Sequence, residues 1–267
     1  MRFVAGCDVG SLTTKAVIME DGRIRASAII KSRPIPADSA SAVIEDVLRA
    51  AALKLDKIAF TVGTGYGRDK MPFADKAVSE IQCHARAARW ALPGARTVID
   101  IGGQDAKAIL MDPDGSILQF VTNDKCAAGT GRFLEVMAKV LGVSLTELGA
   151  MSRRARAPVV LASTCTVWAQ ADVIQYIHSG KDPADIGAGI DSAMAKRVAT
   201  LAGSVKPAPE ICLTGGVAKN QGVAMVLERL LGMKVAPFRK ADPQLAGAIG
   251  AALLAREAVS GSRQAGI

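Results

Sequence analysis

The sequence predicts an α/β protein made of two related halves. Strand-like apolar runs alternate with helical patterns, and the 26 glycines cluster where such elements meet. The strongest observation is a repeat: residues 8–20 align without a gap on residues 100–112, and the copies share Asp, Gly, Lys, Ala and Met at the same offsets. An Asp-Gly pair follows each copy. Such a duplication predicts two α/β halves, which we place at residues 1–95 and 96–267.

Composition narrows the class of protein. The chain has 267 residues, half of them apolar, which is enough for a sizeable core. The net charge of +8 is dispersed and only 4% of residues are aromatic, so we expect no nucleic-acid partner. Because the N-terminal apolar run is too short for a signal peptide and no apolar run is long enough to span a membrane, we expect a cytoplasmic protein with no membrane association.

The first repeat copy reads as a hairpin that can bind phosphate. A buried strand from Phe3 reaches a turn at Gly10, and residues 15–19 return as its partner. Glycine lets a phosphate approach the backbone, hydroxyls and amides bind its oxygens, and a carboxylate can hold hydrated Mg²⁺. The candidate residues of this hairpin are Asp8 for magnesium and Gly10, Ser11, Thr13, Thr14 and Lys15 for phosphate.

The chain between the copies continues the α/β pattern. Residues 40–53 are predicted to form a helix, residues 58–62 a strand that leads into the glycine-rich run 63–68, and residues 78–90 a second helix that ends before Pro93. The second copy then provides its own candidates, which are Asp100, Gly102, Gly103, Gln104 and Lys107. Two such halves facing each other predict a nucleotide cleft with one phosphate hairpin from each side.

Two cysteines each precede a helical pattern. Cys126 lies in a turn of small residues that includes Gly129 and Gly131, before an amphipathic run, and Cys165 precedes a helix over residues 169–177. The free amides of a first helical turn should therefore lie close to each sulfur and stabilise a thiolate or a sulfide cluster.

The cysteines leave two interpretations open. Both could be small buried residues of a core. Alternatively both are ligands, in which case a two-fold dimer would convert two thiolates per chain into the four of a closed site. Cys7 and Cys212 read as core strand residues and Cys83 as a helix residue, and nothing in the sequence gives these three a function.

Two further motifs follow. A strand ending at Thr214 breaks into Gly215-Gly216 before a helix from Asn220 to Leu231, an arrangement that lets a flat ring or sugar approach the backbone and directs a helix N-terminus at phosphate. The cluster Arg153-Arg154-Ala155-Arg156 is predicted to lie in a loop before a strand at Val159, and is either a solvated loop or a docking site for an acidic partner or nucleotide.

These motifs, in this order, resemble the superfamily of actin, hexokinase and the heat-shock chaperone ATPases. The resemblance rests on Asp8-x-Gly-Ser, Asp100-Ile-Gly-Gly and Leu213-Thr-Gly-Gly, and covers nearly the whole chain. Within it, residues 123–133, 163–167 and 100–105 are similar to the iron-sulfur ATPases that activate 2-hydroxyacyl-CoA dehydratases.

The resemblance implies actin-like halves of the ribonuclease H-like type and a homodimer that bridges one 4Fe-4S cluster through Cys126 and Cys165. It implies Mg-ATP as the second cofactor, with Asp8 and Asp100 at magnesium and Gln104 orienting the attacking water. It also implies a 2-hydroxyacyl-CoA dehydratase as electron acceptor and ferredoxin or flavodoxin as electron donor. The acyl-CoA used by that partner enzyme stays open.

Two rival functions belong to neighbouring classes. An ATPase chain of a benzoyl-CoA reductase shares the motifs but pairs with a different chain; the intact motif at residues 102–105 favours the homodimeric activator. A sugar or acetate kinase is disfavoured, because the chain shows no long insertion for a substrate pocket and the cysteine motifs would have no use.

Overall fold

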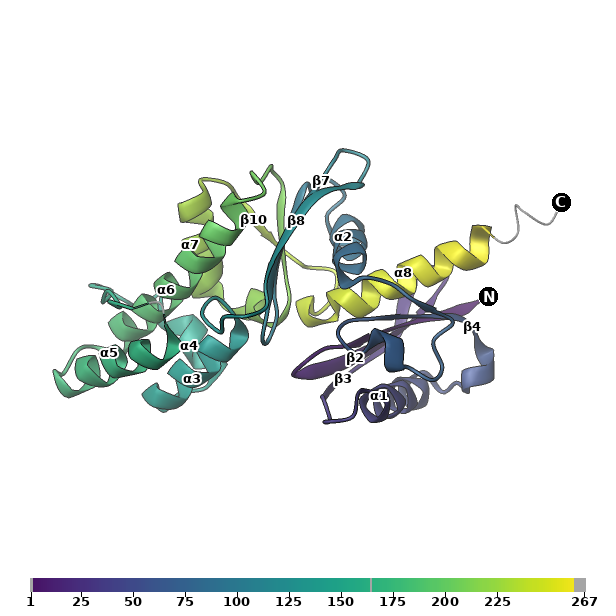
Figure 1. Ribbon diagram of the computed structural model, residues 1–267, viewed down its shortest axis with the longest axis horizontal. Helices are drawn as coiled ribbons and strands as arrows, with labels where there is room; N and C mark the ends of the chain where they lie inside the picture. Colours follow the sequence, from purple (N-terminus) through teal and green to yellow (C-terminus); the bar gives the residue numbers. More distant parts are fainter. Residues whose placement is uncertain (1, 164, 262–267) are drawn as a thin grey trace. The chain divides into compact units, whose positions relative to one another are not determined.

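Two five-stranded sheets with the same strand order organise the chain. The structure, a computed structural model, describes residues 2–163 and 165–261 (Figure 1). It separates into two compact units, Met1–Pro93 with Arg239–Ile267, and Gly94–Phe238. The sheets run β3-β2-β1-β4-β5 and β8-β7-β6-β9-β10, so each strand of one unit has a counterpart in the other. The predicted duplication of an α/β half is therefore confirmed.

The first unit carries the first repeat copy in its β1–β2 hairpin. Its strands are β1 (Phe3–Val9), β2 (Thr13–Glu20), β3 (Arg23–Lys31), β4 (Ile58–Thr64) and β5 (Lys76–Ala77), and its helices are α1 (Pro36–Ala51), α2 (Glu80–Ala91) and α8 (Ala246–Gly261), with short 3-10 turns at Leu55–Lys57, Arg68–Lys70 and Pro243–Leu245. β1 pairs antiparallel with β2 and parallel with β4. The crossover from β3 to β4 is made by α1.

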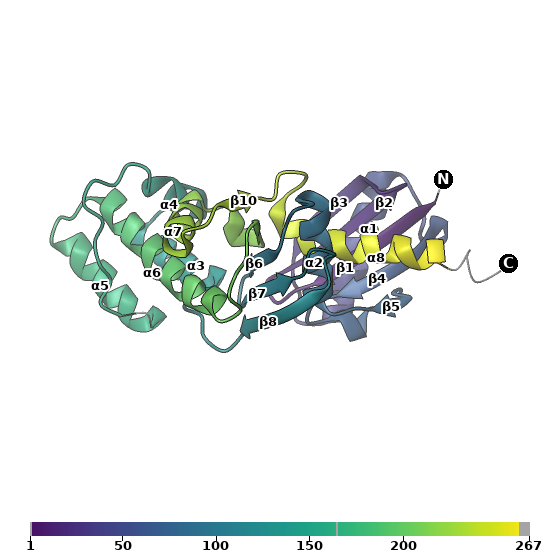
Figure 2. The same ribbon diagram turned by 90° about the horizontal axis from the view of Figure 1, so that it is seen from above.

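Burial along the strands follows their place in this sheet. β1 is central and buried along nearly its whole length, whereas β3 lies at the edge and alternates exposed and half-buried residues. Helix α8 packs against β1 and β4 and against α2 (Figure 2). The small residues of α8 let its backbone lie close to β1: a side chain at Gly6 of β1 would collide with the backbone of Ala248 and Ala252.

The second unit carries the second copy in its β6–β7 hairpin. Its strands are β6 (Thr97–Ile101), β7 (Ala106–Met111), β8 (Ile117–Asn123), β9 (Ile211–Thr214) and β10 (Val235–Pro237), and its helices are α3 (Gly131–Leu141), α4 (Leu145–Met151), α5 (Thr166–His178), α6 (Pro183–Gly203) and α7 (Gln221–Leu231), with a 3-10 turn at Gly216–Lys219. Both β9 and β10 run parallel to their neighbours, since a helix precedes each of them.

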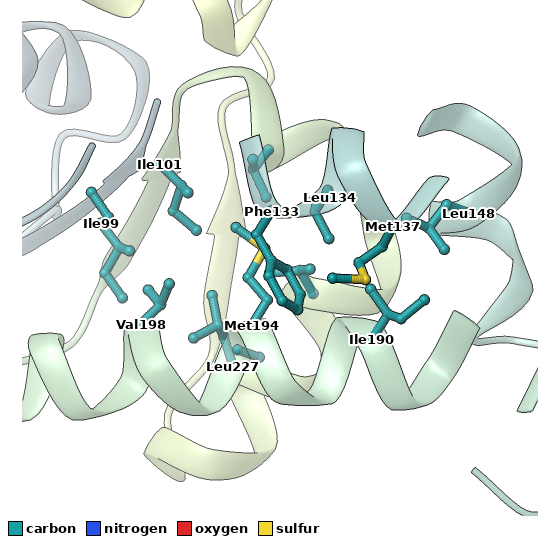
Figure 3. Close-up of a cluster of buried hydrophobic side chains, with 14 of the residues drawn as sticks. Ile99, Ile101, Phe133, Leu134, Met137, Leu148, Ile190, Met194, Val198 and Leu227 are labelled. Carbon is teal, nitrogen blue, oxygen red and sulfur yellow. The ribbon is translucent and has the colours of Figure 1, made fainter. Parts of the chain in front are cut away.

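The core of this unit lies between β6 and the helices α3, α6 and α7. Figure 3 shows Phe133 and Met137 of α3 pointing toward Met194 and Ile190 of α6. All four side chains are at most 1% exposed. Fully burying a side chain of this size contributes roughly 1.5–3 kcal/mol, so this contact fixes α3, and with it the loop that carries Cys126, against the long helix α6.

Two segments differ from the sequence-based expectation. Helix α8 belongs to the first compact unit, although the repeat pattern places residues 239–267 in the second half, because its small side chains fit closely on β1. The predicted strand at Val159 is wrong: the amides of Arg156 and Ala157 bond to the Asp185 carboxylate instead of to a neighbouring strand. Within residues 2–163 and 165–261, no helix has both the length and the apolar character needed to cross a membrane.

Candidate functional site

The first hairpin places a carboxylate opposite a lysine. Asp8, near the end of β1, pairs in register with Lys15, and Lys15 Nζ lies 3.1 Å from Asp8 Oδ2. The turn between them is closed by a hydrogen bond from Gly10 N to Thr13 O (3.2 Å). Asp8 is nearly buried, whereas Ser11 at the tip is exposed. The hairpin therefore combines a fixed carboxylate with an accessible turn.

The predicted phosphate residues of this hairpin divide into two groups. Thr14 is fully buried and its hydroxyl is 2.9 Å from Ser32 Oγ, which in turn donates to Gly10 O at 2.7 Å. The Thr14 hydroxyl is thus part of a hydrogen-bond chain through Ser32 that supports the turn. Ser11 and Thr13 lie at the turn itself, as exposed and half-buried residues.

The second hairpin repeats this geometry with a second carboxylate. Asp100 pairs in register with Lys107, and the turn is closed by a hydrogen bond from Gly102 N to Asp105 O (2.9 Å). Lys107 Nζ lies 2.6 Å from Asp105 Oδ2 and 3.7 Å from Asp100 Oδ2, and all three residues are buried. Gln104 is exposed at the tip. Asp105 has no role in the sequence-based interpretation, although it occupies the position of Thr13 in the repeat. Its carboxylate binds Lys107, a contact that has no counterpart in the first hairpin.

The duplication extends to a third strand that the sequence comparison did not match. Thr64 of β4 pairs with Asp8, and Thr214 of β9 pairs with Asp100. Both threonines are followed by a glycine with a positive φ, +85° at Gly65 and +84° at Gly215. A side chain at either glycine would also collide with the carboxylate of the neighbouring aspartate. Both the positive φ and this close approach therefore require glycine. Thr214 Oγ1 also donates to Asp100 Oδ1 at 2.8 Å.

Beyond Gly215-Gly216, the side chain of Asn220 is committed to internal contacts. Its Oδ1 accepts from Val223 N, which caps α7, and its Nδ2 donates to Asp191 Oδ1 at 2.8 Å. Ser152 Oγ donates to the other oxygen of Asp191 at 2.6 Å. Burial raises the pKa of the Asp191 carboxyl to about 6, against the two hydrogen bonds, which lower it. Asp191 therefore joins the N-cap of α7 to Ser152 within the unit.

The second hairpin is tied to the start of α3. Gly131 N donates to Gly102 O and Arg132 N to Gly103 O, both at 2.8 Å. These two amides of the first helical turn are therefore bonded to the hairpin. The expectation that the first amides of this helix are free beside the Cys126 sulfur is wrong for Gly131 and Arg132. The bonds connect the predicted phosphate turn directly to the segment that carries Cys126.

The five cysteines fall into two classes. Cys7, Cys83 and Cys212 are completely buried, and burial raises their thiol pKa, to about 12 for Cys83 and Cys212. Cys126 is half-buried and Cys165 is exposed. Only these last two can present sulfur to a group outside the core.

The two accessible cysteines occupy different kinds of helix start. Cys165 is the N-cap residue of α5, which agrees with the expectation that it lies at a helix N-terminus. Its amide donates to Ser163 Oγ. Cys126 lies in the loop before α3, where Asn123 Nδ2 donates to its carbonyl and Arg197 Nη2 lies 4.0 Å from its sulfur. Gly129, with φ of +85°, brings this loop against the Arg197 stem.

The donor set fits half of a four-thiolate site. Among residues 2–163 and 165–261, no three His, Cys, Asp or Glu side chains gather closely enough to hold a metal ion. Two accessible thiols from one chain are too few to close such a site, whereas two chains would supply four. The residues thus suit a group shared between two copies.

Two sheets of the same strand order, each with an Asp–Lys hairpin beside a Thr-Gly strand end, define a duplicated α/β fold. A glucokinase from Streptomyces griseus solved with glucose and AMPPNP has the same fold, with a TM-score of 0.58 over 96% of this chain and 99% of that one at 15% identity. Residues 5–255 match the BadF/BadG/BcrA/BcrD ATPase family, and the chain belongs to this family of ATPases.

Relatives within the family are similar over nearly their whole length. The activator of lactoyl-CoA dehydratase from Anaerotignum propionicum is 43% identical, over 96% of this chain and 98% of the relative. The activator of the 2-hydroxyisocaproyl-CoA dehydratase from Clostridium difficile, solved with bound ADPNP, has a TM-score of 0.93 at 41% identity, over 98% of this chain and 97% of that one. One of the chains of the benzoyl-CoA reductase from Thauera aromatica is 33% identical, over 95% of this chain and 93% of the relative.

Proposed function

We propose that this ATPase activates a 2-hydroxyacyl-CoA dehydratase by delivering single electrons to it. Two copies would share one 4Fe-4S cluster, held by Cys126 and Cys165 of each. The observation that carries the proposal is that Cys126 and Cys165 are accessible, whereas the other three thiols are buried. Both accessible cysteines lie in the unit that carries the second phosphate hairpin. The cluster, when bound, supplies the one-electron chemistry.

The geometry of each hairpin supports the following nucleotide roles. Asp8 and Asp100 are the magnesium carboxylates, Lys15 and Lys107 neutralise phosphate charge, and the exposed Gln104 orients the attacking water. Gly10, Ser11 and Thr13 in the first hairpin, with Gly102 and Gly103 in the second, offer the close backbone approach that phosphate needs. Gly215 and Gly216 serve the nucleoside, and Asn220 caps the helix that follows them.

Hydrolysis can act on the cysteine segment through one short route. The carbonyls of Gly102 and Gly103 accept the first amides of α3, so a shift of this turn moves the start of α3 and the loop before it. ATP and water would give ADP and phosphate, while one electron passes from the activator to the dehydratase. An electron carrier of the ferredoxin or flavodoxin type then returns one electron.

The rival within the family is an ATPase chain of a benzoyl-CoA reductase, which would pair with a different ATPase chain. The higher identity to a dehydratase activator, 43% against 33% for the reductase chain, favours the activator. The two differ in assembly: the activator is complete as a dimer of identical chains, and the reductase chain is not.

The test is electron delivery under anaerobic conditions. The reduced protein is mixed in turn with purified lactoyl-CoA, 2-hydroxyisocaproyl-CoA and 2-hydroxyglutaryl-CoA dehydratases, and reduction of the dehydratase is followed with ATP, with ADP and with no nucleotide. We expect the dehydratase to be reduced when ATP is present, and not with ADP or without nucleotide. ATP hydrolysis without any reduction of the dehydratase, or reduction that depends on adding a second ATPase chain, would contradict the proposal.

A further inference from the structure

Residues 153–163, here called the arginine segment, connect α4 to Cys165 and carry a concentrated positive charge. Arg153, Arg154 and Arg156 are all exposed. Among the described residues, no ion pair joins these three guanidinium groups to a carboxylate. From Leu148 to Ala171 the sequence contains no Asp, Glu or Lys at all. Within the segment itself, the only charged side chains are therefore these three arginines.

The backbone of the arginine segment is held in place without help from its arginines. Asp185 Oδ1 accepts from Arg156 N (2.7 Å) and from Ala157 N (2.8 Å), and Asp172 Oδ2 accepts from Ala162 N (2.8 Å). Tyr176 OH donates to Val160 O at 2.8 Å. Carboxylates and a hydroxyl from α5 and α6 thus order a segment that has no helix or strand, and a preordered surface loses less entropy on binding a partner.

The surroundings have the composition of a protein interface. Val160, Val167 and Trp168 are each about two-thirds exposed, at 69%, 68% and 67%, and Trp168 lies one turn into α5 after Cys165. Arginine and tryptophan are enriched at interface centres, where lysine and glutamate are depleted. The exposed apolar residues adjoin the cationic segment and the exposed thiol.

We propose that the arginine segment docks the acidic surface of the protein that donates single electrons to this ATPase. The proposal rests on the proposed function. A donor must bind and leave once per electron, and charge pairs at a protein surface raise the association rate more than the affinity. In each encounter the carrier would lose one electron and this ATPase would gain one.

The test compares two variants with equal loss of positive charge. In one, Arg153, Arg154 and Arg156 become Gln. In the control, Arg23, Arg25 and Lys31, exposed on the edge strand β3, become Gln. Cluster reduction is followed by stopped-flow absorbance with reduced plant-type ferredoxin, and separately with dithionite. We expect the ferredoxin rate at low salt to fall on the order of 10-fold in the first variant alone, with dithionite reduction and ATP hydrolysis unchanged.

Each other outcome decides against the inference. Equal ferredoxin rates in both variants would overturn it. Normal ferredoxin reduction with impaired delivery to the dehydratase would assign the surface to the acceptor instead. If the first variant does not fold, the wild type decides, because a ferredoxin rate that is independent of ionic strength would exclude charge steering. A wild type that takes no electron from either reductant would overturn the proposed function and this inference with it.

Discussion

Replacing Asp191 with Asn should change how the stability of this protein depends on pH. Asp191 is 0% exposed, and burial raises the pKa of its carboxyl from 3.8 to about 6. Between these values the folded protein keeps a proton that the unfolded chain has lost. The free energy of unfolding contributed by Asp191 therefore falls as pH rises through this window and levels off above pH 6.

The size of the effect follows from the two pKa values. At 1.36 kcal/mol per pH unit, the whole shift corresponds to about 3 kcal/mol, of which about 2 kcal/mol lies between pH 4.5 and 7.5. Asp191→Asn has no charge to bury, and it can still accept from Asn220 and donate to the Ser152 hydroxyl. The variant should lose none of this stability as pH rises.

Urea unfolding of both proteins at several pH values measures the difference. We expect the free energy of unfolding of the variant to rise by about 2 kcal/mol relative to that of the wild type between pH 4.5 and 7.5. Asp114→Asn, at an exposed carboxylate, is the matched control and should run parallel to the wild type. Parallel curves for Asp191→Asn would refute the reasoning, because they would mean that Asp191 is already charged at no cost in the folded state.

Two further predictions concern the nucleotide residues. Gln104→Ala should leave ATP affinity unchanged and slow hydrolysis by on the order of 10²-fold, since an exposed glutamine at the turn can position water without holding the nucleotide; normal hydrolysis in this variant would remove Gln104 from the mechanism. Asp8→Ala should instead weaken binding of Mg-ATP, measured by calorimetry with and without magnesium, and an unchanged magnesium dependence would remove Asp8 from the metal site.

The repeat could be recognised from sequence because it resides in local patterns. A strand, a glycine turn and a returning strand leave the same signature at Asp8 and at Asp100, and the structure places both aspartates opposite a lysine. The helices after Cys126 and Cys165 were predictable for the same reason, since apolar residues recur there at helical spacing.

What the sequence did not reveal depends on contacts between distant segments. Asp191 lies in the middle of a helix, and only the fold brings it to Ser152 and Asn220. The bonds from the first turn of α3 to Gly102 and Gly103 likewise replace the free amides that a local reading predicts there. Helix α8 returns to the first sheet because its small residues fit on Gly6, which no local pattern encodes.

A cluster shared between two copies is tested most directly by the iron content of anaerobically purified protein, together with its assembly state. We predict about four irons for each dimer of identical chains, since each chain has only two accessible thiols. Cys126→Ser and Cys165→Ser should each abolish the bound iron, whereas Cys83→Ser, at a buried thiol, should retain it. Four irons on a single chain, or full iron content in either of the first two variants, would contradict a cluster shared between two copies.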